Sequence, residues 1–181
     1  MKNQSLARQI TTLSLLLALQ VVLGRVFALR LPAMGLAEGQ RLSFVHIPLL
    51  MVVILYNPWV NLIYGLVYDL ICSFLFPILA YNPLFTLFAG VVPMVLSFLW
   101  RLTPRRINWG CLGFLSLIYS VKSFFQTPFI LWVSYGTPMV STIPPRLLIW
   151  TLHFPLTVVI LMALFKSLSR TGVLKDYQLR A

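Results

Sequence analysis

The sequence predicts an all-α, polytopic membrane protein with six transmembrane helices, and three observations support this fold class. Hydrophobic residues make up 60% of the 181 residues, and the mean hydropathy is +0.92. Only 9% of the residues are charged, whereas soluble domains carry about 25%. Long apolar runs fill nearly the whole length, so we expect residues 1–181 to form a single six-helix membrane domain.

The predicted spans follow the apolar runs of the chain. They cover residues 6–29, 43–56, 56–76, 83–100, 110–135 and 145–168. The second run is short for a hydrocarbon core of about 30 Å, so we expect it to be tilted, kinked or continuous with part of the preceding connector. We expect Pro128 to interrupt the fifth span and Pro155 to kink the sixth.

The distribution of basic residues predicts that both termini are cytoplasmic, because Lys and Arg are enriched in cytoplasmic segments. With the N-terminus inside, the inner segments contain Lys2, Arg8, Arg101, Arg105, Arg106, Lys166, Arg170, Lys175 and Arg180. The outer segments contain Arg30, Arg41 and Arg146. The net charge of +11 is therefore explained by membrane orientation and does not indicate a partner nucleic acid.

Asp69 is the first residue that a functional account must explain, because it lies inside the apolar third span. A carboxylate there costs about 2.5–3.5 kcal/mol on insertion scales, and such residues usually face a partner or a wet cavity. In this orientation Asp69 lies about 10 Å below the outer surface. Two interpretations remain open: an ion pair with Arg25 or Lys122 that holds the bundle together, or contact with a ligand or ion.

The other polar residues of the spans are also concentrated in the outer half. Arg25 lies about one turn below the outer surface and Arg146 at the outer mouth, although both could equally be anchors at the lipid headgroups. Lys122 lies deeper, with Gln126 one turn above it on the same face. Asn61 shares a helix face with the carboxylate of the third span. Together these positions predict a pocket that opens outward.

The sequence offers little support for a metal site or for enzymatic catalysis. His46 and His153 are expected to be hydrogen-bonded structural groups, and with two dispersed cysteines, Cys72 and Cys111, they provide no metal-ligand pattern. No phosphate loop of the G-x-x-x-x-G-K-[ST] type occurs, and neither G-x-S-x-G nor H-E-x-x-H is present. We therefore expect no cofactor, no metal and no activity of an enzyme.

The first span carries a stripe of small residues. Ala7, Thr11, Ser14 and Ala18 follow one another at spacings of three and four residues. Such stripes allow another helix to approach closely. From the spacing alone, the partner helix could belong to this chain or to another protein.

Six short motifs along the chain form a pattern, and they lie at residues 23–25, 42–48, 65–69, 75–77, 81–87 and 145–147. The most specific of them is the run Phe-Pro followed by Tyr-x-Pro-x-Phe-Thr-Leu. Together they resemble the substrate-binding S components of energy-coupling factor transporters, and most of all their folate-specific family. The chain departs from the family pattern at Asn57-Pro58, where the family usually has Gly-Pro, and at Leu84, where it commonly has glycine.

The resemblance implies a vitamin-binding subunit of the bacterial cell membrane that has no motor of its own. Such a subunit would dock on a coupling transmembrane protein with two ABC-type ATPases and would reorient in the bilayer to deliver its substrate. The stripe from Ala7 to Ala18 matches the position at which this superfamily contacts the coupling protein, which favours the intermolecular interpretation.

Folate chemistry fits the candidate residues. A pterin presents adjacent N–H donors that one carboxylate, Asp69, could accept as a pair. Faces for the flat ring could come from Tyr68, Tyr81, Phe85 and Trp132, although such aromatics are usually packing or interface residues. The glutamate tail carries carboxylates that would need Arg25, Arg146 or Lys122.

Three alternatives remain beside a folate S component. The same machinery could carry riboflavin, thiamine or niacin. An ion- or proton-coupled carrier could use Asp69, but 181 residues without an evident inverted repeat weigh against it. A purely structural membrane protein is disfavoured, because ionisable residues inside membrane spans are costly and usually have a function. The segments 32–42 and 136–144 are plausible lids at the outer mouth.

Overall fold

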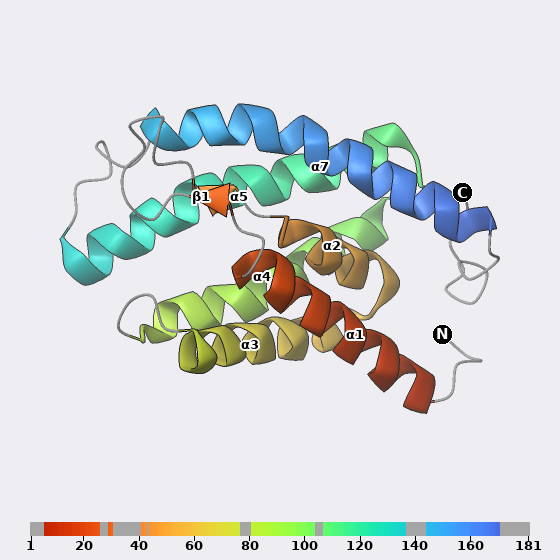
Figure 1. The fold of residues 1–181 in the computed structure, drawn as a ribbon, viewed down its shortest axis with the longest axis horizontal. Coiled ribbons are helices and arrows are strands. Elements are labelled where there is room, and N and C mark those ends of the chain that lie inside the picture. Colours follow the sequence, from red (N-terminus) through yellow and green to blue (C-terminus); the bar gives the residue numbers. More distant parts are fainter. Residues whose placement is uncertain are drawn as a thin grey trace.

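The computed structural model describes residues 6–25, 29–30, 41–42, 44–76, 81–103, 107–136 and 144–170. They form α1 (Leu6–Arg25), α2 (His46–Leu55), α3 (Pro58–Leu75), α4 (Pro83–Leu102), α5 (Trp109–Tyr135) and α7 (Pro144–Arg170) (Figure 1). Two short strands, β1 (Leu29–Arg30) and β2 (Arg41–Leu42), pair antiparallel between α1 and α2. The predicted all-α fold class is confirmed, with this two-residue pairing as an addition.

Five of the described helices, α1, α3, α4, α5 and α7, are long and apolar enough to cross a membrane. The helix α4 begins at the predicted residue, Pro83. Proline suits this position, because the first turn of a helix does not use its backbone N–H groups in intrahelical bonds. The helix α2 has only 10 residues, too short to span a bilayer alone. The expected interruption at Pro128 is wrong, since α5 runs through it without a break. Neighbouring helices commonly make an interior proline tolerable in membrane helices.

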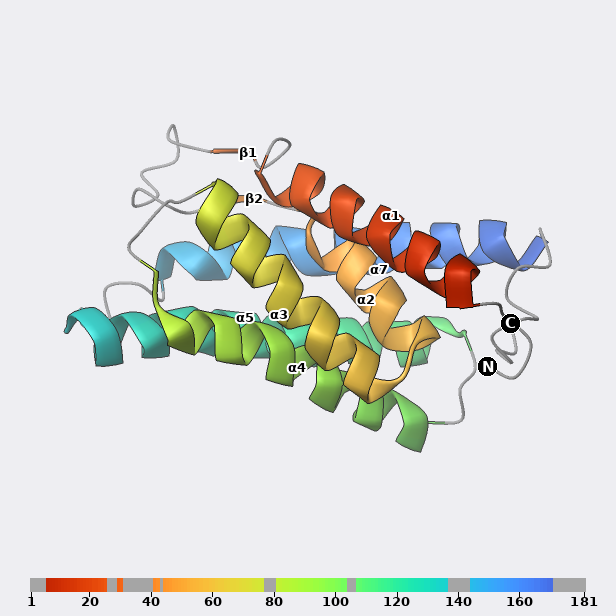
Figure 2. The ribbon, with the colours of Figure 1, turned by 90° about the horizontal axis from the view of Figure 1, so that it is seen from below.

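The helices form two layers with α2 between them. The pair α5 and α7 lies on one side and the pair α3 and α4 on the other, while α1 crosses obliquely beside α2 (Figures 1 and 2). The start of α1 and the end of α7 lie at the same end of the bundle, here called the first end (Figure 2). The second end contains the end of α1 and the start of α2. This arrangement agrees with termini on one side of the membrane.

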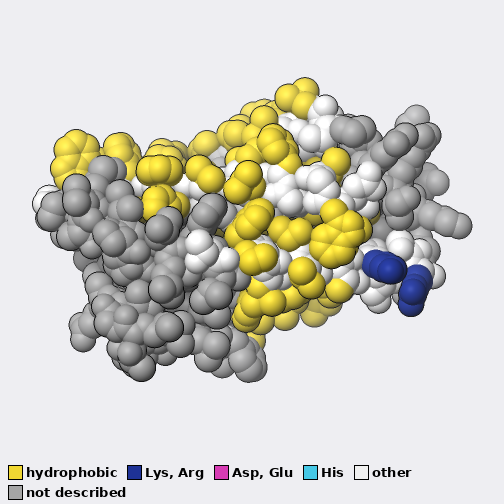
Figure 3. All heavy atoms as spheres, turned by 90° about the horizontal axis from the view of Figure 1, so that it is seen from above, with side chains coloured by type: hydrophobic (Ala, Val, Ile, Leu, Met, Phe, Trp, Pro, Cys, Tyr) yellow, Lys and Arg dark blue, Asp and Glu magenta, His cyan; other side chains and the backbone are white. Residues whose placement is uncertain are grey.

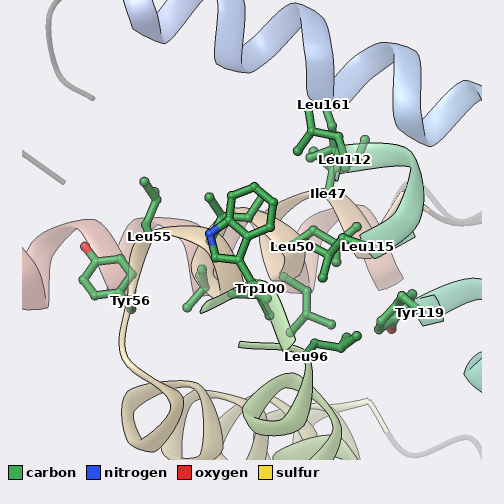
Figure 4. Packing of buried hydrophobic residues seen from close by; sticks show 14 of the residues in the cluster. Ile47, Leu50, Leu55, Tyr56, Leu96, Trp100, Leu112, Leu115, Tyr119 and Leu161 are labelled. Atoms are coloured by element: carbon green, nitrogen blue, oxygen red, sulfur yellow. The ribbon is translucent and has the colours of Figure 1, made fainter. Parts of the chain in front are cut away.

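The core is built around α2, whose residues are apolar on every side. Such a helix has no polar face to expose and is therefore buried. Leu50, Val52 and Val53 are fully buried, and side chains of α4, α5 and α7 surround them. Figure 4 shows Leu96, Leu112, Leu115 and Leu161 converging on this helix. Close packing of this kind gains many small dispersion contacts.

The outer surface of the bundle is apolar. Leu15, Phe74 and Leu102 are among the large hydrophobic side chains that are most exposed. In the view of Figure 3 hydrophobic side chains cover the described middle of the face, and the Lys and Arg side chains that are coloured there lie toward one end. Contiguous apolar surface of this extent suits contact with lipid.

Two glycines let α3 and α4 cross at very short range. A Cβ added at Gly65 would lie 1.9 Å from the carbonyl oxygen of Ala89, and one added at Gly90 would lie 2.8 Å from Cγ of Leu66. The two helices are antiparallel, so the residue one turn after Gly65 on α3 faces the residue one turn before Gly90 on α4. The crossing therefore places Asp69 opposite Thr86.

Candidate binding site

The second end of the bundle gathers the polar side chains of several helices. Arg25 ends α1 and His46 begins α2, while Asp69 lies in the last two turns of α3. Thr86 lies in the first turn of α4, and Lys122 lies near the middle of α5. Up-and-down connectivity brings the end of α1, the end of α3 and the start of α4 to the same end of the bundle (Figure 2), whereas Lys122 lies deeper, near the middle of α5.

Asp69 is held by a short hydrogen-bond network, here called the Asp69 network. Its Oδ2 accepts a hydrogen bond of 2.7 Å from Oγ1 of Thr86, a buried residue. The same Thr86 oxygen lies 3.2 Å from the hydroxyl of Tyr81. Tyr81 is half exposed and stacks on Phe74 with a centroid separation of 6.0 Å. Because an ionised carboxylate can accept about four hydrogen bonds, Asp69 keeps capacity for further donors.

The structure favours neither of the predicted ion pairs with Asp69. Within the described ranges Lys122 instead places its Nζ 4.9 Å from the ring centroid of Tyr119, on the same face of α5. Arg25 lies close enough to Tyr68 to act on it electrostatically. The hydrogen bond that Asp69 makes to described residues comes from Thr86, a neutral group.

A second group of polar side chains lies between α2, α5 and α7. We call His46, Tyr119, Lys122 and His153 the histidine cluster. The ring of His46 lies 4.6 Å from that of Tyr119 and 4.6 Å from that of His153, which it meets edge-on. Oγ1 of Thr157 lies 3.4 Å from Nδ1 of His153.

His46 differs from the hydrogen-bonded structural histidine that the sequence led us to expect. Its Nδ1 is buried and has no hydrogen-bond partner among the described residues. His153, in contrast, is buried beside Thr157 and stacks on Phe44 at a centroid distance of 5.9 Å. An unpaired polar nitrogen in the interior is costly and requires an explanation.

Tyr68 and Asp69 are neighbours in sequence but point to different parts of the bundle. A Cβ added at Gly24 would lie 2.9 Å from the Tyr68 hydroxyl and 3.2 Å from Cγ2 of Val45, so Tyr68 faces the end of α1 and the start of α2. Successive residues of a helix point about 100° apart, and Asp69 accordingly faces α4.

Asn61 has a role away from the second end. It is fully buried two turns before Asp69, and its Nδ2 donates to the carbonyl oxygens of Asn57, at 3.0 Å, and Tyr56, at 3.3 Å. These bonds satisfy backbone acceptors at the junction of α2 and α3. Its Nδ2 thus stabilises the turn between α2 and α3 at the first end of the bundle.

The remaining predicted residues are placed less closely together. Phe85 and Gln126 are partly buried, whereas Trp132 is half exposed and lies beside Phe129, with 6.4 Å between ring centroids. Arg146 belongs to the first turn of α7, but its side chain lies outside the described residues. Most of the two predicted lids, 32–42 and 136–144, also lies outside them.

Sequence reasoning missed three features of this region: Thr86, Tyr119 and the buried Nδ1 of His46 without a partner among the described residues. Thr86 had a signal, since it is the threonine of the Phe-Thr-Leu motif used for the family resemblance. Tyr119 lies one turn before Lys122 and could have been found by that spacing. For His46 no local pattern indicates an unpaired Nδ1.

The small-residue stripe of α1 is exposed. Ala7, Thr11, Ser14 and Ala18 all lie on the outer surface, whereas Leu16 and Gln20 point into the bundle. Gln20 accepts a 2.7 Å hydrogen bond from the hydroxyl of Tyr64, which fixes this side of α1 inward. Within the described part of the chain, the stripe therefore does not serve internal packing.

Comparison with known proteins identifies the fold. No family model matches the chain, and no curated protein matches its sequence. Among solved structures, the crystal structure of FolT bound with folic acid superposes with a TM-score of 0.72 at 25% identity. The match covers 87% of this chain and 92% of the FolT chain. This chain is FolT-like. The resemblance to the folate family of energy-coupling factor S components, drawn from the motifs, is confirmed.

The similarity extends over nearly the whole of both chains, so it concerns the fold as a whole and not one segment of it. It also points to a transport subunit rather than to an enzyme.

Proposed function

We propose that this FolT-like chain is the membrane-embedded S component of an energy-coupling factor transporter and captures folate from outside the cell. The observation that carries the proposal is the match to folate-bound FolT over 87% of the chain. The Asp69 network supports it, because a partly buried carboxylate with free acceptor capacity can receive the paired N–H donors of a pterin.

The proposed ligand contacts are those predicted residues that lie toward the second end. They are Asp69, Arg25, Arg146, Lys122, Tyr68, Tyr81, Phe85, Gln126 and Trp132. We leave Asn61 out because of its place near the start of α3, at the first end, where its Nδ2 donates to backbone carbonyls; its buried Oδ1 has no hydrogen-bond partner among the described residues. Tyr81 has the clearest position among the aromatics, since its hydroxyl belongs to the Asp69 network.

The proposed partners are a coupling transmembrane protein and two ABC-type ATPases, which would hydrolyse ATP in place of this chain. The exposed stripe of α1 supports this assignment, since small residues permit close approach of a helix from another subunit. We place the complex in the bacterial plasma membrane with both termini of this chain in the cytoplasm, as the excess of Lys and Arg at the inner segments indicates.

The purified subunit should bind folate at micromolar or lower concentration. Five tryptophans, among them the half-exposed Trp132, provide a fluorescence signal that bound folate should quench. Isothermal titration calorimetry gives the same Kd without optical overlap between ligand and protein. If folate and reduced folates fail to bind while riboflavin, thiamine or niacin does, the transporter class survives and the folate assignment is lost.

Bulky substitution on the stripe should separate binding from assembly. Ser14→Trp is expected to leave the folate Kd within about twofold but to reduce co-purification of the coupling protein at least tenfold, because a bulky side chain keeps the two helices apart. Leu19→Trp is the matched control, since Leu19 is also exposed on α1 but lies off the stripe. Loss of folate binding with intact assembly would contradict this division.

A further inference from the structure

The helix α1 is attached to the bundle along one narrow line of its surface. Its buried residues are Leu16 and Gln20, and Gly24 follows at the same spacing of four. Residues four apart lie on one face of a helix, so these three positions form one line, here called the inner line. Leu15 and Leu19, directly beside it, are exposed. Because lipid tails are as apolar as leucine, apolar packing alone determines the rotation of α1 only weakly.

The inner line contains a buried hydrogen bond between two side chains. The hydroxyl of Tyr64 on α3 donates to Oε1 of Gln20 at 2.7 Å. Both residues are buried, with exposed fractions of 6% and 2%. Hydrogen bonds weaken steeply away from linear geometry, and the apolar interior of a membrane offers no replacement partner. This bond is therefore satisfied at one rotation of α1, whereas apolar contact permits many.

One turn further along, α1 approaches α3 so closely that a side chain would not fit. A Cβ added at Gly24 would lie 2.9 Å from the hydroxyl of Tyr68 and 3.2 Å from Cγ2 of Val45. Tyr68 follows Tyr64 by four residues, as Gly24 follows Gln20, and the two helices run in the same direction (Figure 2). The two contacts thus belong to one seam, in which the hydrogen bond sets the rotation and the glycine permits the close approach.

The small-residue stripe lies on the side of α1 opposite to the inner line. Successive residues of an α-helix are rotated by about 100°, so residues two apart point about 200° from one another. Ser14 and Leu16 are two apart, as are Ala18 and Gln20. The stripe is accordingly exposed where the inner line is buried. A contact that fixes the inner line therefore also fixes the direction in which the stripe points.

We propose that the hydrogen bond between Tyr64 and Gln20 positions α1 for assembly: it fixes the rotation of the helix and so presents the stripe to the coupling protein. The proposal rests on the proposed function, which assigns that partner to the stripe. A rotation of about 100° would put Leu15 where Ser14 stands, and a leucine keeps a neighbouring helix at a distance. Gln20 and Tyr64 are thus positioning residues for assembly, and neither is among the proposed folate contacts.

The first test measures two affinities in each variant, for folate and for the coupling protein with its two ATPases, by titration in lipid nanodiscs. Tyr64→Phe removes the hydroxyl and keeps the ring, and Gln20→Leu removes the acceptor. Each should weaken assembly by about threefold to tenfold, the range typical of one hydrogen bond between membrane helices, and leave the folate Kd within about twofold. The double variant should lose no more than either single variant, because each alone already removes the bond.

A matched control separates positioning from general loss of stability. The hydroxyl of Ser97 on α4 donates to the carbonyl oxygen of Tyr56 at 3.2 Å, also in the buried interior. Ser97→Ala removes this bond without touching α1. It should lower the thermal unfolding midpoint as Tyr64→Phe does, but it should leave the affinity for the coupling protein unaltered.

The second test measures the rotation of α1 and needs neither folate nor the coupling protein. Spin labels are attached to Ser14→Cys and, separately, to Leu17→Cys, in a background in which Cys72 and Cys111 are replaced by alanine. Ser14 is exposed and Leu17 is partly buried, so dissolved oxygen should relax the first label at least about twice as strongly as the second. Tyr64→Phe should bring the two labels close to equality. If the background fails to fold, the affinities of the first test decide the question.

The outcomes distinguish this inference from the proposed function. Failure of the unaltered subunit to bind the coupling protein would overturn the proposed partner and the inference together. Normal assembly of both Tyr64→Phe and Gln20→Leu would overturn the inference alone. Equal losses in Ser97→Ala would also overturn it, because the effect would then be one of stability, and so would a label contrast that persists in Tyr64→Phe.

Discussion

Asp69→Asn should weaken folate binding by about 3 kcal/mol, which corresponds to about 150-fold in Kd. The asparagine keeps the shape of the side chain, and its oxygen can still accept the hydrogen bond from Thr86. It cannot accept one N–H bond on each of its two terminal atoms, because one of them is an NH2 group that only donates. Calorimetric titration of the purified variant with folate measures the effect.

A matched variant separates the carboxylate from its support. Thr86→Ser retains the hydroxyl that donates to Asp69 and should bind folate within about threefold of the unaltered protein. Unchanged affinity in Asp69→Asn would return Asp69 to a structural role. In that case Asp69→Asn would lower the thermal unfolding midpoint and leave the folate affinity unchanged, because only the interaction with Thr86 would have been altered.

Gly65→Ala should destabilise the bundle by about 3 kcal/mol and abolish folate binding as well. The added Cβ would lie 1.9 Å from the carbonyl oxygen of Ala89 and 2.7 Å from its carbonyl carbon, which are backbone atoms of α4. Backbone cannot turn aside as a flexible side chain can, so the two helices must separate. Separation would also pull Asp69 away from Thr86.

The control for this prediction is another helical glycine. Gly113 lies in α5, and a Cβ added there would meet nothing within 4 Å. Gly113→Ala should therefore be neutral or stabilising by up to about 1 kcal/mol, from the better helix propensity of alanine. Thermal unfolding in detergent, followed by size-exclusion chromatography, compares the two variants. Equal stability of both would contradict the tight crossing of α3 and α4.

The helices themselves could be predicted because their signals are local. Runs of apolar residues of sufficient length mark α1, α3, α4, α5 and α7, and turn residues mark their ends. The fourth helix begins at the predicted Pro83, after the N-cap Asn82, whose side chain accepts a 3.0 Å hydrogen bond from the backbone of Leu84. The interruption at Pro128 was wrong for a related reason, since the context that tolerates a proline lies in other helices.

The candidate site could be predicted only in part. Asp69 and Lys122 were found because an ionisable residue in an apolar run is conspicuous. Their partners were not found, because Thr86 and Tyr119 are ordinary residues of membrane helices. The contact between Asp69 and Thr86 depends on the crossing at Gly65 and Gly90, which aligns α3 with α4.

The sequence by itself determined that this protein is an all-α membrane protein, and its motifs determined the family that the FolT-like fold confirms. Both follow from composition and short patterns, which are local properties of the chain. Only the tertiary structure decided that Asp69 bonds to Thr86, that Asn61 serves the junction of α2 and α3, and that His46 keeps an unpaired Nδ1. These facts depend on how closely and at what rotation the helices pack, which no single helix encodes.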